Sequence, residues 1–289
     1  MAALSYYILL PFIYLISLLP FRVLYILSDF LYFILYKLLG YRRKVVANNL
    51  ENAFPEKTEV ERLEIERKFY KYFCDLILET VKTLTISPEE LKERVSVQHP
   101  GVFQSFYDQT QSVIIVMGHL GNWEIAGARF SQEPYHILYV IYHPMRNPYF
   151  DRLIYHMRTR LGNRLYAMKE TFRGMARDRA VISATAFIAD QTPSPDHAYW
   201  TTFLHQDTPI FTGTAKISRK MRYPVIYVSV QQPRRGRYVI NAEVLVEKPE
   251  QLSEDEISEL YTKRLEKDIV ATPHLWLWTH RRWKHKRPE

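Results

Sequence analysis

The chain has 289 residues, enough to bury a sizeable core in one domain with an appendage rather than in two full domains. Its formal net charge of +8 favours an anionic partner: nucleic acid, an acidic protein or an anionic membrane surface. A single cysteine, Cys74, excludes an internal disulfide and a cysteine metal cluster, and it fits a protein that faces the cytosol.

The first forty residues are the least polar part of the chain. Residues 2–21 carry no charged side chain, and this run has about the length of a helix that crosses a bilayer. Residues 23–39 are also mostly apolar, and Pro20 with Arg22 predicts a bend between two helices. A signal peptide is disfavoured because no basic residue precedes the apolar run, and a buried core hairpin would need far more surrounding protein. We therefore expect residues 1–40 to form a membrane-anchoring or interfacial helical hairpin, whether it spans the bilayer or lies in its surface.

A basic cluster follows the apolar block directly and consists of Lys37, Arg42, Arg43 and Lys44. Positive residues next to a membrane segment favour the cytoplasmic side, close to anionic headgroups. The alternative is that the cluster is the solvated face of the next helix. On the first interpretation, residues 41–289 form a domain on the cytoplasmic side of the membrane.

Three helices are expected before any strand. Residues 41–54 have the pattern of an amphipathic helix ended by Pro55, and residues 56–85 that of a longer, highly charged helix. Ser87 is a suitable cap for a short third helix, because Pro88 would take its first position.

The pattern changes at residue 112. Residues 112–117 are continuously apolar, which is typical of a strand buried on both faces of a parallel sheet. Further strands are expected at residues 136–142, 181–189, 223–230 and 238–246, with helices at residues 122–130, 147–161 and 211–221. This alternation predicts an α/β fold with a mostly parallel sheet flanked by helices.

The segment Gly118-His119-Leu120-Gly121-Asn122-Trp123-Glu124 follows the first buried strand. Active sites of open α/β sheets lie at this edge of the sheet. The glycines permit a sharp strand-to-helix turn, and Asn122 is suited to cap the helix. A carboxylate one turn into that helix could reach the His119 imidazole and raise its basicity. A buried structural histidine is the alternative, since a lone His-x4-Glu spacing is weak evidence.

Several catalytic motifs are missing from the chain. There is no Gly-x-Ser-x-Gly, no His-Glu-x-x-His, no Gly-x-Gly-x-x-Gly and no phosphate loop. A His/Glu base without a protein nucleophile suits direct attack by a substrate hydroxyl on an activated acyl group. We expect no metal and no other cofactor.

Five sequence blocks together resemble the lipid A biosynthesis late acyltransferases, a family of the lysophospholipid acyltransferase-like superfamily. The first is the block from His119 to Glu124. The others are, in chain order, Arg42-Arg43-Lys44-Val45 with Asn48-Asn49-Leu50 and Ala53-Phe54-Pro55; Arg158-Thr159-Arg160-Leu161-Gly162; Asp190-Gln191 with Phe203 and Thr212-Gly213; and Trp276-Leu277-Trp278-Thr279-His280-Arg281-Arg282-Trp283-Lys284. One departure is visible, since Phe203-Leu204-His205 stands where members commonly show a Phe-Phe-Gly turn.

The resemblance implies a donor, an acceptor and a location. The donor would be an acyl thioester on acyl carrier protein, and the acceptor a hydroxyl of a lipid A precursor of lipopolysaccharide synthesis. The protein would lie on the inner membrane, with residues 41–289 as the acyltransferase domain on the cytoplasmic side. His119 would act as the general base and Glu124 would orient it.

Further site residues follow from the same resemblance. The backbone N–H near Gly121 and Asn122, or the guanidinium of Arg158 or Arg160, would stabilise the oxyanion or bind acceptor phosphates. For the two arginines the alternative is a solvated helix face. Asp190 would line the site or cap the turn after it.

The aromatic and basic C-terminal block, residues 276–284, would meet the acidic carrier protein, lie at the membrane interface, or pack in the core. Another glycolipid or a polyene lipid stays open as the acceptor. A basic nucleic-acid-binding protein is the alternative from a different class, but it would leave the apolar hairpin unexplained, so no nucleic acid is expected.

Overall fold

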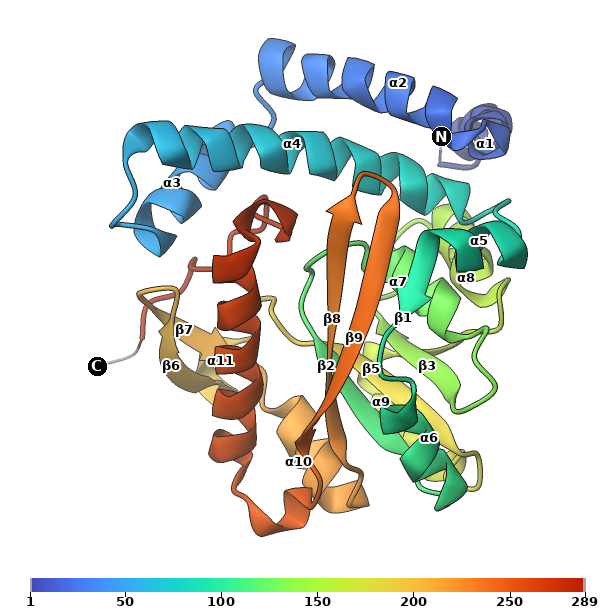
Figure 1. Ribbon diagram of the computed structural model, residues 1–289, viewed down its shortest axis with the longest axis vertical. Coiled ribbons are helices and arrows are strands. Elements are labelled where there is room, and N and C mark those ends of the chain that lie inside the picture. Colours follow the sequence, from blue (N-terminus) through green and yellow to red (C-terminus); the bar gives the residue numbers. More distant parts are fainter. Residues whose placement is uncertain (1, 288–289) are drawn as a thin grey trace.

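The computed structural model describes residues 2–287 and contains a seven-stranded sheet with helices on both faces (Figure 1). The strand order is β1-β9-β8-β2-β5-β3-β4, and every neighbouring pair is parallel except the β8–β9 hairpin. The strands are β1 (Val95–Val97), β2 (Val113–Met117), β3 (Ile137–Tyr142), β4 (Arg164–Ala167), β5 (Ser183–Ile188), β8 (Val225–Arg234) and β9 (Arg237–Val246). A separate antiparallel hairpin contains β6 (Tyr199–Phe203) and β7 (Gln206–Ile210).

The central strand β2 is buried along its whole length because helices cover both of its faces. Val113 and Ile115 pack with α6 (Gly101–Asp108) and α7 (Trp123–Phe130), while Ile114 packs on the opposite face. That opposite face is covered by α9 (Thr171–Arg177), α10 (Gly213–Met221) and α11 (Glu254–Ala271). The expected α/β architecture is therefore confirmed.

The N-terminal third is helical, as its periodicity predicts. Its helices are α1 (Ala2–Leu18), α2 (Phe21–Tyr32), a π-helical turn η1 (Phe33–Leu38), α3 (Arg43–Ala53), α4 (Glu59–Lys82) and α5 (Pro88–Arg94). A capping box of Thr58 and Glu61 starts α4, and Ser87 caps α5 as expected. Helix α4 runs across the end of the sheet toward which β8 points, and α2 lies on its far side (Figure 1).

The remaining elements are short except for one helix. Helix α8 (Pro148–Thr159) precedes β4, and single 3₁₀ turns occupy Met168–Glu170, Pro195–His197, Pro249–Gln251 and Pro273–Leu275. The expected segments at 122–130, 147–161 and 211–221 are helical, with ends that differ by one or two residues. Strands β1, β4, β6 and β7 and helices α6, α9 and α11 had no counterpart among the expected elements.

Helices α1 and α2 meet at the expected bend, since α1 ends at Leu18 and α2 begins after Pro20. Their outer faces carry exposed apolar side chains, whereas Phe21 and Leu24 are buried against the domain. Within residues 2–287, no single helix is long and apolar enough to cross a membrane. One bent pair, Phe21–Leu38 with Arg43–Ala53 at 86°, meets the length and composition test together.

Candidate active site

His119 and Asp190 meet at the carboxyl edge of the sheet because of strand register. Strands β2 and β5 are parallel neighbours with Met117 opposite Ile188, and each of the two residues lies two positions beyond that pair. The His119 Nδ1 atom is 2.6 Å from Asp190 Oδ1, and the His119 main-chain N–H donates to Asp190 Oδ2 at 2.7 Å. The contact with Nδ1 leaves Nε2 as the ring nitrogen that faces outward.

Asp190 is held as a carboxylate although it is buried. Burial alone would raise its pKa, but the charge of the His119 ring and hydrogen bonds from His119 and the Trp276 indole lower that pKa to about 2. The Trp276 Nε1–H donates to Asp190 Oδ2 at 2.8 Å. The carboxylate therefore fixes the position of the imidazole and can stabilise its protonated form.

The expected contact between Glu124 and the His119 imidazole is not made. Both oxygens of Glu124 accept from the Arg158 guanidinium, with Arg158 Nε 3.0 Å from Oε2. The reason is geometric: Glu124 lies on the first turn of α7, facing α8, while the carboxyl end of β5 brings Asp190 under the ring. Glu124 still lines the same cavity as His119, together with Arg158.

The glycines of the motif serve close packing. A Cβ on Gly118 would lie 2.6 Å from Leu265 and 3.1 Å from Asp190 Oδ2. Gly121 has a φ of +67°, and a Cβ there would lie 2.2 Å from the Val230 carbonyl oxygen. Its N–H donates to the Leu275 carbonyl at 3.0 Å, so the expected role of this N–H as an oxyanion donor is corrected.

Asn122 confirms the expected cap but not an expected role in substrate binding. Its Oδ1 accepts from the Ile125 N–H at 3.1 Å, and its Nδ2 donates to Glu79 at 2.7 Å. The residue is fully buried, and both polar ends of its side chain are used within the protein. Asn122 therefore shapes the loop and does not line the cavity.

Two side chains surround the outer nitrogen of His119. Gln191 Nε2 lies 3.4 Å from His119 Nε2, and the ring of Trp123 meets the imidazole edge-on with centroids 4.8 Å apart. Both residues line the cavity. Gln191 was part of a family block but was not identified as a site residue, although its place directly after Asp190 was a usable signal.

A cavity of 460 Å³ opens beside His119 and extends between α7 and the sheet. Its wall there is apolar and includes small residues that leave room for a ligand. The small residues are Ala126, Gly127 and Ala186, and the rest of this wall consists of Ile115, Met117, Phe130 and Leu138. Ligand sites of proteins are typically such cavities, with a few polar groups at one end.

Arg160 does not reach this cavity. Its guanidinium donates to the Thr83 carbonyl at 3.1 and 3.2 Å and to the Ile86 carbonyl, so it closes the C-terminal end of α4. The expectation that Arg160 binds the oxyanion or a phosphate is therefore corrected, because its guanidinium lies at the end of α4 and does not line the cavity.

The C-terminal block is mainly core. Trp276 and Trp278 are buried, and Arg282 is 1% exposed and donates to the Pro209 carbonyl at 2.7 Å. Burial lowers the pKa of Arg282 to about 10. Among the basic residues of the block, Arg281 and Lys284 remain exposed. Core packing, one of three alternatives, is thus what the tryptophans at 276 and 278 do.

Two blocks that are far apart in the sequence lie together. Arg42 donates to the Thr279 carbonyl at 2.8 Å, and Asn49 donates to the carbonyls of Trp278 and His280 at 2.9 and 3.0 Å. The block that begins at Arg42 therefore holds the C-terminal block in place. The C-terminal block contains Trp276, which bonds Asp190.

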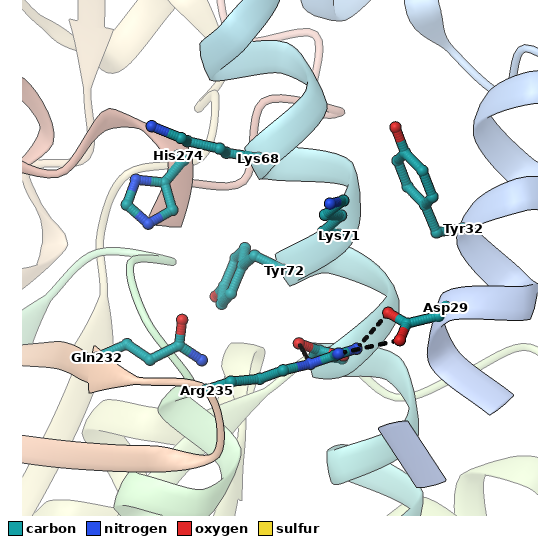
Figure 2. A pocket seen from close by; sticks show the side chains of 9 residues that line it. Asp29, Tyr32, Lys68, Lys71, Tyr72, Gln232, Arg235 and His274 are labelled. Atoms are coloured by element: carbon teal, nitrogen blue, oxygen red, sulfur yellow. Dashed lines mark hydrogen bonds and ion pairs between the residues drawn. The ribbon is translucent and has the colours of Figure 1, made fainter. Parts of the chain in front are cut away.

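A second cavity, of 610 Å³, lies between α2, α4 and the β8–β9 turn (Figure 2). Arg235 closes it by pairing with Asp29 of α2 and Asp75 of α4, at 2.7 and 2.6 Å. His119 does not line it. Within residues 2–287, no group of three or more His, Cys, Asp and Glu side chains could hold a metal ion.

The sequence of almost the whole chain matches one known protein family. Residues 1–285 match the family described as bacterial lipid A biosynthesis acyltransferase. The match includes the His119 motif, the Asp190 strand end and the C-terminal block. Comparison with curated proteins gives no match.

Proposed function

Since the chain belongs to the bacterial lipid A biosynthesis acyltransferase family, we propose that it transfers a fatty acyl group from acyl carrier protein to a lipid A precursor. The family implies acyltransferase activity on lipid A-like substrates. The thioester donor and the acceptor hydroxyl are part of the proposal. The observation that carries it is the His119–Asp190 pair at the mouth of an apolar cavity.

His119 acts as the general base in this proposal. Nε2 removes the proton of the acceptor hydroxyl while its oxygen bonds to the thioester carbonyl carbon. The carbon–sulfur bond then breaks, and the imidazolium returns the proton to the leaving sulfur. Asp190 holds Nδ1 and stabilises the imidazolium, and a positioned base of this kind accelerates such reactions about 10²- to 10⁴-fold.

The oxyanion needs a donor other than the Gly121 N–H. The Gln191 amide is beside His119 Nε2, and the Arg158 guanidinium lies in the cavity wall. Arg158 uses Nε and Nη2 on Glu124, so Nη1 is left for a carbonyl oxygen or an acceptor phosphate. Glu124 takes a different part from the one expected, because it holds this arginine and not the imidazole.

The apolar cavity receives the acyl chain. Small side chains at Ala126, Gly127 and Ala186 keep the space between α7 and the sheet open. The chain would enter with its carbonyl carbon near His119 and its methyl end toward Leu138. The volume is in the range of roughly 300–1,000 Å³ that ligand cavities occupy.

The N-terminal helices bring the site to the membrane. Leu4, Ile8, Phe12, Ile26 and Phe30 are exposed on the outer faces of α1 and α2. Exposed apolar side chains in such number mark an interaction surface. We place this surface on the cytoplasmic leaflet of the inner membrane, where the acceptor lipid resides and where the positive net charge favours anionic headgroups.

Mass spectrometry of the lipid products tests the proposal. The protein is incubated with acyl carrier protein thioesters and a lipid A precursor, and the precursor is expected to gain one acyl mass. His119→Ala should abolish the product while the fold, followed by circular dichroism, is retained. Wild-type transfer by His119→Ala would disprove the base, and no transfer to any lipid hydroxyl would disprove the reaction.

A further inference from the structure

Glu79, on α4, is a buried carboxylate outside the catalytic cavity. It has no exposed surface and accepts three hydrogen bonds: from Tyr25 at 2.8 Å, from Tyr238 at 2.6 Å and from Asn122 at 2.7 Å. None of these donors is a cation. Burial raises the pKa of Glu79 to about 7 even though the three donors lower it. A carboxylate kept at this cost needs a reason beyond packing.

The contact with Asn122 fixes which way the Asn122 carboxamide points. Above its pKa of about 7 the Glu79 carboxylate is ionised and can only accept, so the Asn122 NH₂ group must face it. That leaves the Asn122 oxygen for the Ile125 N–H at 3.1 Å, which starts α7. A flipped carboxamide would set oxygen against oxygen at Glu79 and leave the helix without its cap.

The start of α7 in turn places the reacting groups. Trp123 and Glu124 are the first two residues of that helix, and they contact His119 and Arg158 respectively. On the other side of Asn122, the Gly121 carbonyl accepts from Tyr72 of α4 at 2.6 Å. Helix α4 therefore holds two successive residues, Gly121 and Asn122, of the loop between β2 and α7.

Tyr25 ties the same carboxylate to the apolar helix α2. The Tyr25 hydroxyl reaches Glu79 Oε1 across the α2–α4 interface, which also contains the hydrogen bond from Ser28 to Asp75 at 2.6 Å. Helix α2 lies along α4 on the side away from the sheet (Figure 1), and Arg235 joins both helices nearby (Figure 2). Ser28 bonds Asp75, whereas the side chain of Asn122 bonds Glu79 and Ile125, so the hydroxyl of Ser28 has no connection to Asn122 through these bonds.

We propose that Glu79 is a positioning residue for acyl transfer, which orients Asn122 and so sets α7 against His119, and that Tyr25 links this carboxylate to α2. The proposal rests on the proposed role of His119. Glu79 itself does not line the cavity and touches no substrate. A role in packing alone would require only that the volume of the side chain be kept.

Glu79→Gln is the first test, because it keeps the volume but adds a donor that permits the carboxamide of Asn122 to flip. We expect kcat for transfer from acyl carrier protein to fall about five- to tenfold, the equivalent of one helix cap, with KM for the donor unchanged. Wild-type kcat in a folded Glu79→Gln variant would overturn the proposal.

Exchange of donor and acceptor separates positioning from packing. Asn122→Asp alone sets two carboxylates together and should lower kcat further. Combined with Glu79→Gln, it restores a donor–acceptor pair and a capping oxygen, so kcat should recover to within about threefold of wild type. A double variant no better than the worse single variant would contradict the proposed orientation.

Tyr25→Phe and Ser28→Ala form a matched pair on α2 and decide the matter if Glu79→Gln does not fold. Each removes one hydroxyl that bonds α4, but only the Tyr25 hydroxyl bonds Glu79. Tyr25→Phe should lower kcat about two- to threefold, while Ser28→Ala should leave kcat unchanged. Equal effects would reject the link. An inactive His119→Ala beside a fully active Glu79→Gln would reject only the role of Glu79, whereas an active His119→Ala would reject the proposed function.

Discussion

Replacing Asp190 by asparagine tests which carboxylate serves the His119 imidazole. Asp190 accepts from the imidazole and from the main-chain N–H of His119, at 2.6 and 2.7 Å. Asparagine has nearly the same shape but can present its NH₂ group to Nδ1, which would place the imidazole proton on Nε2 and remove the base. The substitution also removes the charge that stabilises the imidazolium.

The expected magnitude follows from these two losses. We expect kcat to fall about 10³- to 10⁴-fold, as it does when the aspartate of a hydrolase triad is replaced, which corresponds to about 4–5.5 kcal/mol. Glu124→Gln keeps one hydrogen bond to Arg158 and does not touch the imidazole, so its effect should be smaller, about tenfold. Transfer from acyl carrier protein is measured at saturating donor, with circular dichroism as the control for folding.

Double variants give the sharper answer. Because Asp190 acts through the imidazole, Asp190→Asn added to His119→Ala should lower the residual rate little further. Glu124→Gln should lower it by about the same factor in both backgrounds, since it acts through Arg158. If Asp190→Asn keeps more than about a tenth of wild-type kcat while Glu124→Gln loses 10³-fold, the assignment of the carboxylates is reversed.

Three further outcomes are expected. The pKa of Glu79 is raised from 4.5 to about 7, so the stability it contributes is present below pH 4.5 and lost as pH rises through 7. The unfolding free energy of Glu79→Gln, measured in urea, should therefore rise by about 2.5 kcal/mol relative to wild type between pH 5 and pH 8. Gly127→Leu should shift the preferred donor to shorter acyl chains in a competition assay, whereas Gly127→Ala, whose Cβ would meet its nearest atom at 3.7 Å, should not. His205 has a φ of +63°, so His205→Gly should raise the unfolding free energy by up to about 1 kcal/mol, and Gln206→Gly, on β7, should lower it.

Much of the fold could be predicted because its central strands are continuous apolar runs. The pattern at 112–117 is a strand with both faces buried, and the pattern at 122–130 is a helix. Strand β4 has only four residues, of which Tyr166 alone is buried, so no long apolar run revealed it. The β6–β7 hairpin lacks a glycine at its turn, where Leu204 and His205 both adopt positive φ. The sequence signal for a hairpin turn is a glycine or asparagine at these positions, so this turn could not be predicted from that signal.

The contact that the sequence predicted for the His119 imidazole differs from the one in the structure. The spacing of His119 and Glu124 suggested a contact within one strand–turn–helix unit. The partner of the ring is Asp190, 71 residues away, because β5 and not β3 lies beside β2. Sheet order is a property of the whole fold, and no local spacing encodes it. The same holds for Arg160, whose donors reach the end of α4.

The N-terminal helices are both a surface and part of the core, which changes how the proposed division at residue 40 should be understood. The outer faces of α1 and α2 are apolar and exposed, as a membrane-facing surface requires. On the inner face, Phe21 and Leu24 are at most 3% exposed, and Tyr36 packs in the core with Tyr70. Removing this segment would therefore open the core as well as remove the surface. Tyr25 of α2 and Asn122 both donate to Glu79 of α4, so movement of α2 relative to the sheet would disturb Glu79, and the exposed apolar surface and the loop between β2 and α7 share the support of α4.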